Sequence, residues 1–104
     1  MSKVTVEPGI CGFETTIEAV AEDKKNVRLS IETQCPNLKP LAEELTTADG
    51  YKECFAKVGE SPVFVTVRKY CRHAACPVPT AIIKGIEVAC NLALPRDVKM
   101  TISK

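Results

Sequence analysis

The sequence predicts an α+β fold, a two-layer sandwich in which helices cover one face of a mixed sheet of about five strands. One observation is a change of hydrophobic period, from strand-like alternation in residues 13–33 to helix-like spacing after Pro36. A second is size, because 104 residues of which 45% are hydrophobic can form one core but not two. We therefore expect a single domain over residues 1–104, with the element order β-β-β-α-α-β-α-β.

Three strands are predicted in the first third of the chain. Residues 3–6 form a short alternating run that ends before a Pro-Gly pair. Residues 13–21 and 27–33 also alternate between apolar and polar side chains, and only a short polar turn separates them. These two runs predict an antiparallel hairpin in which Phe13 lies beside Thr33.

Helical spacing begins after Pro36. Apolar residues between Leu38 and Leu45 recur at helical intervals, so we expect a helix that starts at residue 36 or 37 and packs one face on the sheet. Residues 51–58 predict a second, two-turn helix that ends at Gly59.

Two strands and the longest helix are predicted in the second half of the chain. The β-branched run of residues 62–70 predicts a fourth strand, and the alternation of residues 98–102 predicts the last one. Between them, residues 76–94 predict a helix that is apolar around most of its circumference. Such a helix is nearly buried or presents a second face to a partner subunit. Gly85 in its middle indicates a close approach to the sheet.

Composition and charge exclude several classes of function. A net charge of +1 and an aromatic content of 5% without Trp give no footprint for nucleic acid or an anionic membrane surface. No apolar run is long enough to span a membrane. Because residues 1–6 do not resemble a secretory signal, we expect a cytoplasmic protein.

Cysteine is the unusual feature of the composition, with six in the chain. Disulfides are rare in the cytoplasm, so thiols in such a chain more often bind metal, do thiol chemistry or pack in the core. Cys54 and Cys90 fall on apolar helix faces and are expected to be core residues. The other four lie at the ends of predicted strands or the starts of predicted helices: Cys11, Cys35, Cys71 and Cys76.

The predicted topology brings these four cysteines to one edge of the sheet. The hairpin places Cys11 and Cys35 together, and a helical crossover that returns as a parallel strand would bring Cys71 and Cys76 to the same edge. If instead the helix carrying Cys54 spans the sheet, the fourth strand reverses and the second pair moves away.

The surroundings of the cysteines favour thiolate chemistry. Cys35 and Cys76 each precede a proline at a helix start, where free backbone N–H groups and the helix dipole favour the thiolate. Basic side chains add positive charge around Cys71 and Cys76, namely Arg68, Lys69, Arg72 and His73. The first hypothesis is therefore a metal site of Cys11, Cys35, Cys71 and Cys76, with His73 as a substitute ligand, that holds Zn²⁺ or an iron–sulfur cluster. Zinc is the commoner of the two.

A second hypothesis is thiol chemistry at Cys76. The element Cys76-Pro77-Val78-Pro79, followed by a helix with Lys84, resembles the Cys-Pro-x-Pro element of the TusA-type sulfur carriers. That local resemblance implies a sulfur-transfer or redox protein in which Cys76 is the catalytic nucleophile and carries a persulfide. A third hypothesis is a domain with inert thiols that binds an unknown protein partner, or itself, through the last helix. The residues leave open whether the chain is an enzyme.

Over nearly its full length the chain resembles a small prokaryotic domain family of unknown function. The matching elements are Ile10-Cys11-Gly12-Phe13, Cys35-Pro36-Asn37, His73-Ala74-Ala75-Cys76-Pro77-Val78-Pro79, Ile82-Ile83-Lys84 and Leu92-Ala93-Leu94-Pro95. The resemblance implies that Cys11, Cys35, Cys71 and Cys76 form the family's cysteine set and that Cys54 and Cys90 are peripheral. It implies no particular activity.

Overall fold

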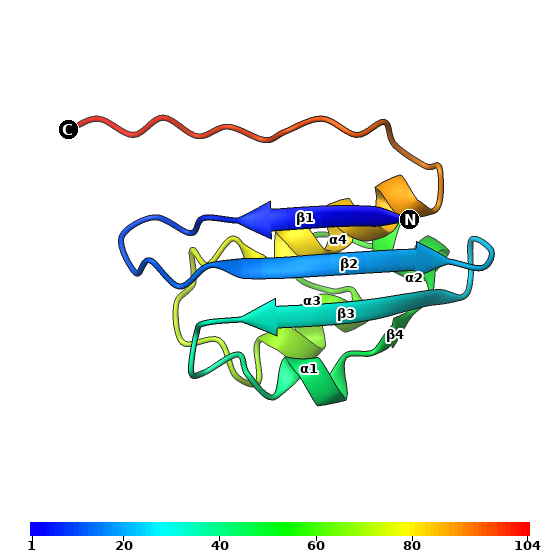
Figure 1. Ribbon diagram of the computed structural model, residues 1–104, viewed down its shortest axis with the longest axis horizontal. Coiled ribbons are helices and arrows are strands. Elements are labelled where there is room, and N and C mark those ends of the chain that lie inside the picture. Colours follow the sequence, from blue (N-terminus) through cyan, green and yellow to red (C-terminus); the bar gives the residue numbers. More distant parts are fainter.

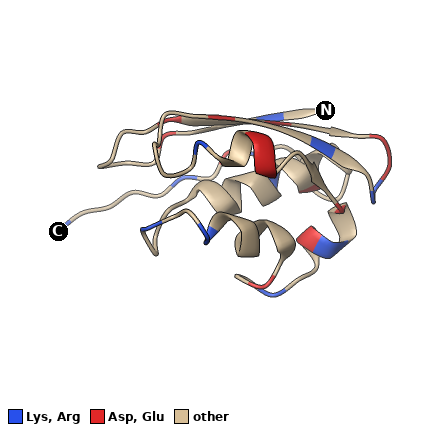
Figure 2. Ribbon diagram, turned by 90° about the horizontal axis from the view of Figure 1, so that it is seen from below, with Lys and Arg blue, Asp and Glu red and all other residues tan.

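The computed structural model describes residues 1–104 as an antiparallel sheet with helices on one face (Figures 1 and 2). The sheet has the strand order β1 (Ser2–Val6), β2 (Thr15–Ala21), β3 (Val27–Thr33) and β4 (Thr47–Ala48). The helices are α1 (Leu41–Glu44), α2 (Gly50–Cys54), α3 (Pro62–Val67) and α4 (Val78–Ala89). The predicted α+β class and the placement of the helices are confirmed. The mixed sheet of about five strands is not, because the structure has a four-stranded sheet in which every pair is antiparallel.

The predicted hairpin of β2 and β3 is confirmed, with a shift of register. Thr15, not Phe13, lies opposite Thr33, and the hydroxyl oxygens of the two threonines are 2.7 Å apart in the buried layer. Buried and exposed side chains alternate along the whole of β3. The alternation therefore predicts the strands correctly. The buried threonine pair is the last pair of residues at the open end of the hairpin.

Helix α4 forms the centre of the core. On one side it packs on β1 and β2, and on the other it is covered by α2 and α3. Ile82 and Ile86 on α4 and Ile17 on β2 are completely buried. A Cβ at Gly85 would lie 3.2 Å from Val4 Cγ2, so the expected close approach of this helix to the sheet is confirmed. The helix is thus nearly buried, and it is shorter than the 76–94 expected.

The prediction of a strand at residues 62–70 is wrong, because Pro62–Val67 is helix α3. Ser61 caps this helix by accepting the N–H of Phe64, and Pro62 occupies the first turn, where no N–H is needed. Val63 and Val67, four residues apart, are buried, whereas Val65 is 39% exposed. Helical burial and a complete N-terminal cap outweigh the β propensity of the valines, whose local preference is weak.

Glu53 on α2 completes the cap of α3 from a distance in the sequence. Its side chain is buried, and its two carboxylate oxygens accept the Val63 N–H at 3.1 and 3.2 Å. The Ser61 hydroxyl also bonds to it, yet burial raises the pKa of Glu53 above its ordinary value. The folded protein therefore keeps the Glu53 proton at a pH at which the unfolded chain has lost it.

We expect Glu53→Ala to lower the free energy of unfolding by about 2 kcal/mol, because it leaves the buried Val63 N–H without a partner. Glu53→Gln keeps an acceptor and should cost less. Since the pKa is raised, the stabilising effect of the Glu53 proton is complete below pH 4.5 and is lost as pH rises through the folded-state pKa. Urea unfolding between pH 4 and 7 should show this loss in the wild type and not in Glu53→Gln. Equal pH dependence in the two proteins would contradict this role.

The prediction of a last strand at residues 98–102 is also wrong. These residues form no strand, and the side chains of Val98, Met100 and Ile102 are exposed. In Figure 1 this part of the chain leaves the end of α4 and runs past β1. Its alternating pattern is suited to a strand, but a strand needs a neighbour for its backbone groups, and none pairs with it here.

The expected first helix is shorter than its apolar spacing suggests. A series of turns over residues 36–40 precedes α1, and the second helix ends at Cys54 rather than at Gly59. No helix combines the length and apolar character needed to cross a lipid bilayer.

Candidate functional site

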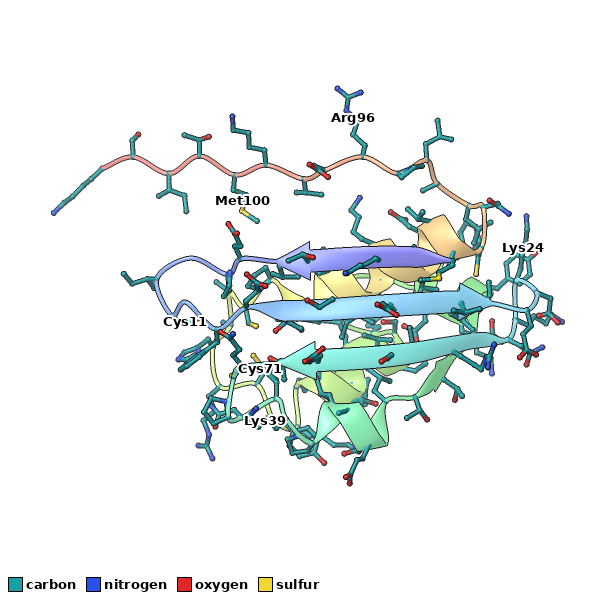
Figure 3. The ribbon with its side chains drawn as sticks, in the orientation of Figure 1. Cys11, Lys24, Lys39, Cys71, Arg96 and Met100 are labelled. Atoms are coloured by element: carbon teal, nitrogen blue, oxygen red, sulfur yellow. The ribbon has the colours of Figure 1, made fainter.

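The four cysteines predicted as a set lie on loops at one end of the sheet. Cys11 is on the β1–β2 loop, Cys35 follows β3, and Cys71 and Cys76 are on the loop between α3 and α4. Figures 1 and 3 show these loops at the same end, with Cys11 and Cys71 labelled in the second view. The loops converge although no parallel strand forms, because α3 and its following loop bring the chain back to the end at which β3 finishes.

Cys76 lies at the centre of this group, just before the N-terminal turn of α4. Burial, followed by the nearby Cys71 thiol and then by Cys35, raises the pKa of Cys76 to about 11. The Val78 N–H at the start of α4 acts in the opposite direction by bonding to the sulfur, but does not overcome the burial. The helix start therefore stabilises the thiolate as expected, while burial keeps the thiol protonated at neutral pH.

Backbone hydrogen bonds set the positions of the other two cysteines. The Cys35 N–H donates to Thr33 Oγ1 at 3.2 Å, which ties it to the end of β3. The Cys71 N–H donates to the Val67 carbonyl at 2.9 Å, which ties it to the end of α3, and its thiol donates to the His73 carbonyl at 3.4 Å. Cys35, Cys71 and Cys76 are all half-buried. They form what we call the thiol cluster.

Cys11 is outside the thiol cluster. It is exposed in a turn in which Gly9 and Gly12 have left-handed backbones and the Gly12 N–H donates to the Gly9 carbonyl at 3.0 Å. His73 is also exposed. No group of three or more His, Cys, Asp or Glu side chains is positioned to hold a metal ion. The structure thus brings Cys76 near Cys71, with Cys35 in their vicinity, and leaves Cys11 and His73 exposed.

The basic residues expected around the site are only partly available to it. Lys69 is paired with Glu44 at 2.8 Å, and the Tyr70 hydroxyl donates to the same carboxylate. The hydrogen bonds from Lys69 and Tyr70 lower the pKa of Glu44. Arg68 and Arg72 are exposed and appear in none of the ion pairs. The charge beside the cluster is therefore smaller than the sequence indicates.

Cys54 and Cys90 are part of the core, as predicted. Cys90 is buried, and Cys54 is half-buried and packed against the core cluster. Burial is the main cause that raises the pKa of Cys54 to about 11. Neither residue belongs to the loops that carry the thiol cluster.

A family model described as a family of unknown function, DUF6951, matches residues 2–102. The chain belongs to DUF6951. The match confirms the expected membership of a family of unknown function, while the local resemblance of the DUF6951 chain to sulfur carriers stays a prediction. Comparison with curated proteins and with solved structures gives no match.

From the sequence, the four loop cysteines of this DUF6951 chain are expected to form one set. In the structure, Cys11 lies outside the thiol cluster. The difference has a signal in the sequence, because Cys11 is followed by Gly12 and stands two residues after Gly9, whereas Cys35 and Cys76 are followed by proline. Nearby glycines indicate an adaptable loop, whereas a following proline restricts the backbone. The nearness of Cys71 to Cys76 has no comparable signal, since it depends on how the loop 71–77 folds.

Proposed function

We propose that the protein binds a thiophilic metal, Zn²⁺ or an iron–sulfur cluster, through Cys35, Cys71 and Cys76, with Cys11 as the fourth ligand. The observation that supports this most is that the loops carrying these cysteines meet at one end of the sheet, where the Cys76 thiol lies near Cys71 and Cys35. Cysteine thiolates are the usual ligands of structural zinc sites, and here they come from two loops, one after β3 and one between α3 and α4. Zinc is the preferred metal because tetrahedral thiolate sites hold it most often.

The protonation of Cys76 favours metal binding over nucleophilic catalysis. A reactive cysteine works as a thiolate and sits where its pKa is lowered, but burial raises the pKa of Cys76 to about 11. A metal ion deprotonates its thiol ligands outright, so a high pKa does not prevent coordination. Closely spaced thiols that oppose one another's ionisation are also the groups whose repulsion a cation relieves.

The fourth ligand is assigned to Cys11 from its loop. The two left-handed glycines give the β1–β2 loop a backbone that can change conformation at little cost, and the loop lies at the same end of the sheet as the thiol cluster. Binding would draw Cys11 inward and close the site. His73 is the alternative ligand, because it lies between Cys71 and Cys76.

Since all six cysteines are free, we assign the protein to a reducing compartment such as the cytoplasm.

Elemental analysis of protein purified without oxygen should find about one zinc, or the iron and sulfide of one cluster, per chain. Cys76→Ser should lower the affinity for Zn²⁺ by more than about 100-fold, because it removes a ligand from a small set. Competition with a chromophoric chelator measures this change.

The matched control is Cys54→Ser, which changes a half-buried thiol of similar pKa outside the cluster. It should leave the affinity within about threefold of wild type. Protein without stoichiometric metal that also fails to bind Zn²⁺, or equal losses in the two variants, would overturn the proposal. Circular dichroism establishes that both variants are folded.

A dithiol–disulfide function is the second candidate, and the nearness of Cys71 to Cys76 on one loop favours it. In exchange with a disulfide-bearing partner, the two thiols would lose two hydrogen atoms and form one S–S bond while the partner disulfide is reduced. A metal-free protein whose intact mass falls by two hydrogens on oxidation, with Cys71 and Cys76 joined in one peptide pair, would support this function instead.

A further inference from the structure

The C-terminal segment, residues 96–104, has the pattern of a strand without being one. Apolar residues alternate with polar ones in the run Val98-Lys99-Met100-Thr101-Ile102-Ser103. Val98, Met100 and Ile102 are 63%, 75% and 90% exposed. Three apolar side chains that alternate along an extended, exposed segment are a row that fits the inner face of a sheet.

The end of α4 sets the direction in which this segment leaves. Asn91 has a left-handed backbone with φ of 58°, and its N–H donates to the Val88 carbonyl at 3.1 Å. The Leu92 N–H donates to the Glu87 carbonyl at 2.9 Å, which completes a Schellman motif, and Pro95 follows. From this exit the segment runs past β1 in the same direction as β1 and pairs with no strand (Figure 1).

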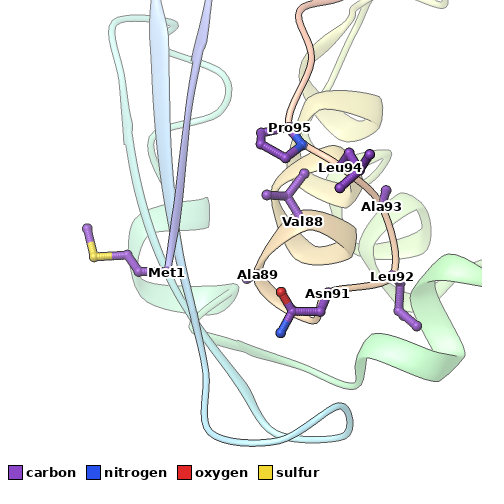
Figure 4. Close-up of a pocket in the computed structure, with 8 residues that line it drawn as sticks. All are labelled: Met1, Val88, Ala89, Asn91, Leu92, Ala93, Leu94 and Pro95. Carbon is purple, nitrogen blue, oxygen red and sulfur yellow. The ribbon is translucent and has the colours of Figure 1, made fainter.

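Strand β1 is an open edge of the sheet. It has β2 on one side and no strand on the other, so half of its backbone N–H and C=O groups face outward. Ser2, Val4 and Val6 point toward the helices, and Lys3 and Thr5 point to solvent. A pocket of about 460 Å³ opens between the start of β1 and the end of α4 (Figure 4). Most of its lining is apolar and includes Met1, Val88 and Leu92.

We propose that two copies of the chain exchange their C-terminal segments, each of which adds an antiparallel strand to β1 of the other copy. A two-fold axis would place the incoming segment between β1 and the chain's own segment. Because the own segment and β1 run in the same direction, the incoming one would be antiparallel to both. The exchange gives the open edge of β1 a strand to pair with. The three inward-facing apolar side chains of the incoming segment cover the apolar surface beside the pocket.

In one antiparallel register, apolar side chains lie opposite apolar ones and the charged side chains that meet have opposite signs. It pairs Glu7 with Lys99, Val6 with Met100, and Val4 with Ile102. A shift of two residues in one direction sets Asp97 opposite Glu7, two like charges, and a shift in the other sets Lys104 beside Val4 in the apolar row. The exchange therefore predicts a Glu7–Lys99 contact between the two copies.

The mass in solution tests the exchange. Sedimentation equilibrium of the full chain between 1 and 100 μM should give twice 11.3 kDa. Removal of residues 97–104, or the double change Met100→Lys and Ile102→Lys, should raise the dimer dissociation constant at least about 100-fold. These residues are exposed within one copy, so the variants should keep the wild-type circular dichroism spectrum.

The control Val58→Lys changes an apolar residue that is 91% exposed outside the segment and should leave the dimer intact. Glu7→Lys should weaken the dimer by about tenfold, and Glu7→Lys combined with Lys99→Glu should restore it. A monomer at 100 μM, or a dimer that survives the truncation, would overturn the exchange. Failure of the charge swap to restore the dimer would overturn the antiparallel register.

Discussion

The affinity for Zn²⁺ is expected to rise by at least about three decades for each pH unit between pH 6 and 8, because the three thiols of the thiol cluster bind as thiolates. Each thiol that coordinates releases one proton, and the slope of the logarithm of the affinity against pH counts the protons released. Cys76 contributes one full released proton to this slope, because its pKa of about 11 keeps it protonated across this pH range. Chelator competition at pH 6, 7 and 8, corrected for protonation of the chelator, measures the slope.

The same slope identifies the fourth ligand. With Cys11 as the fourth ligand one more thiol proton is released and the slope approaches about four decades per pH unit, whereas with His73 no fourth thiol takes part and the slope stays nearer three. Cys11→Ser should lower the slope by one in the first case and leave it unchanged in the second. A slope of about one or less would show that the thiols do not bind as a group and would contradict the proposed site.

Gly50→Ala is expected to lower the free energy of unfolding by about 3 kcal/mol. A Cβ at this position would lie 2.5 Å from the Lys24 carbonyl oxygen and 2.6 Å from Cys90 Sγ, so the backbone of the β2–β3 turn would have to move. Helix propensity alone predicts the opposite sign, since Ala is favoured over Gly in a helix by about 1 kcal/mol. Urea unfolding gives the difference.

A second substitution separates the two clashes at Gly50. Cys90→Ala added to Gly50→Ala removes the contact with the sulfur but not that with the Lys24 carbonyl, so most of the loss should remain. Lys52→Ala, an exposed change on the same helix, serves as the control and should stay within about 0.5 kcal/mol of wild type. A Gly50→Ala protein as stable as wild type would mean that the turn yields easily.

The period of the hydrophobic residues predicts those elements that pair or pack with segments close to them in the sequence. The hairpin of β2 and β3 follows from alternation and a short turn, and the long apolar helix follows from its spacing. The last strand was predicted by the same reasoning and is absent, because alternation specifies a strand face and says nothing about where a pairing edge is found. The exchange proposed above supplies that edge from a second copy.

The candidate site, too, is predicted by the sequence only in part. The positions of Cys11, Cys35, Cys71 and Cys76 between elements were visible in the sequence. Their convergence at one end of the sheet was expected from a parallel fourth strand, and in the structure helix α3 and its following loop produce it instead. The protonation of Cys76 was not, because the basic residues and helix start nearby favour the thiolate and only burial reverses the balance. Burial depends on contacts from the whole fold, which no local pattern contains.

The sequence by itself determined the α+β class, the central hairpin, the core role of Cys54 and Cys90 and the set of loop cysteines. Each of these rests on spacing along the chain or on residues adjacent in it. Only the tertiary structure decided that residues 62–67 are a helix, that Gly50 must lack a side chain and that the Cys76 thiol lies near Cys71. These depend on the Glu53 carboxylate, the Lys24 carbonyl and a folded loop, which reach their positions only once distant segments pack together.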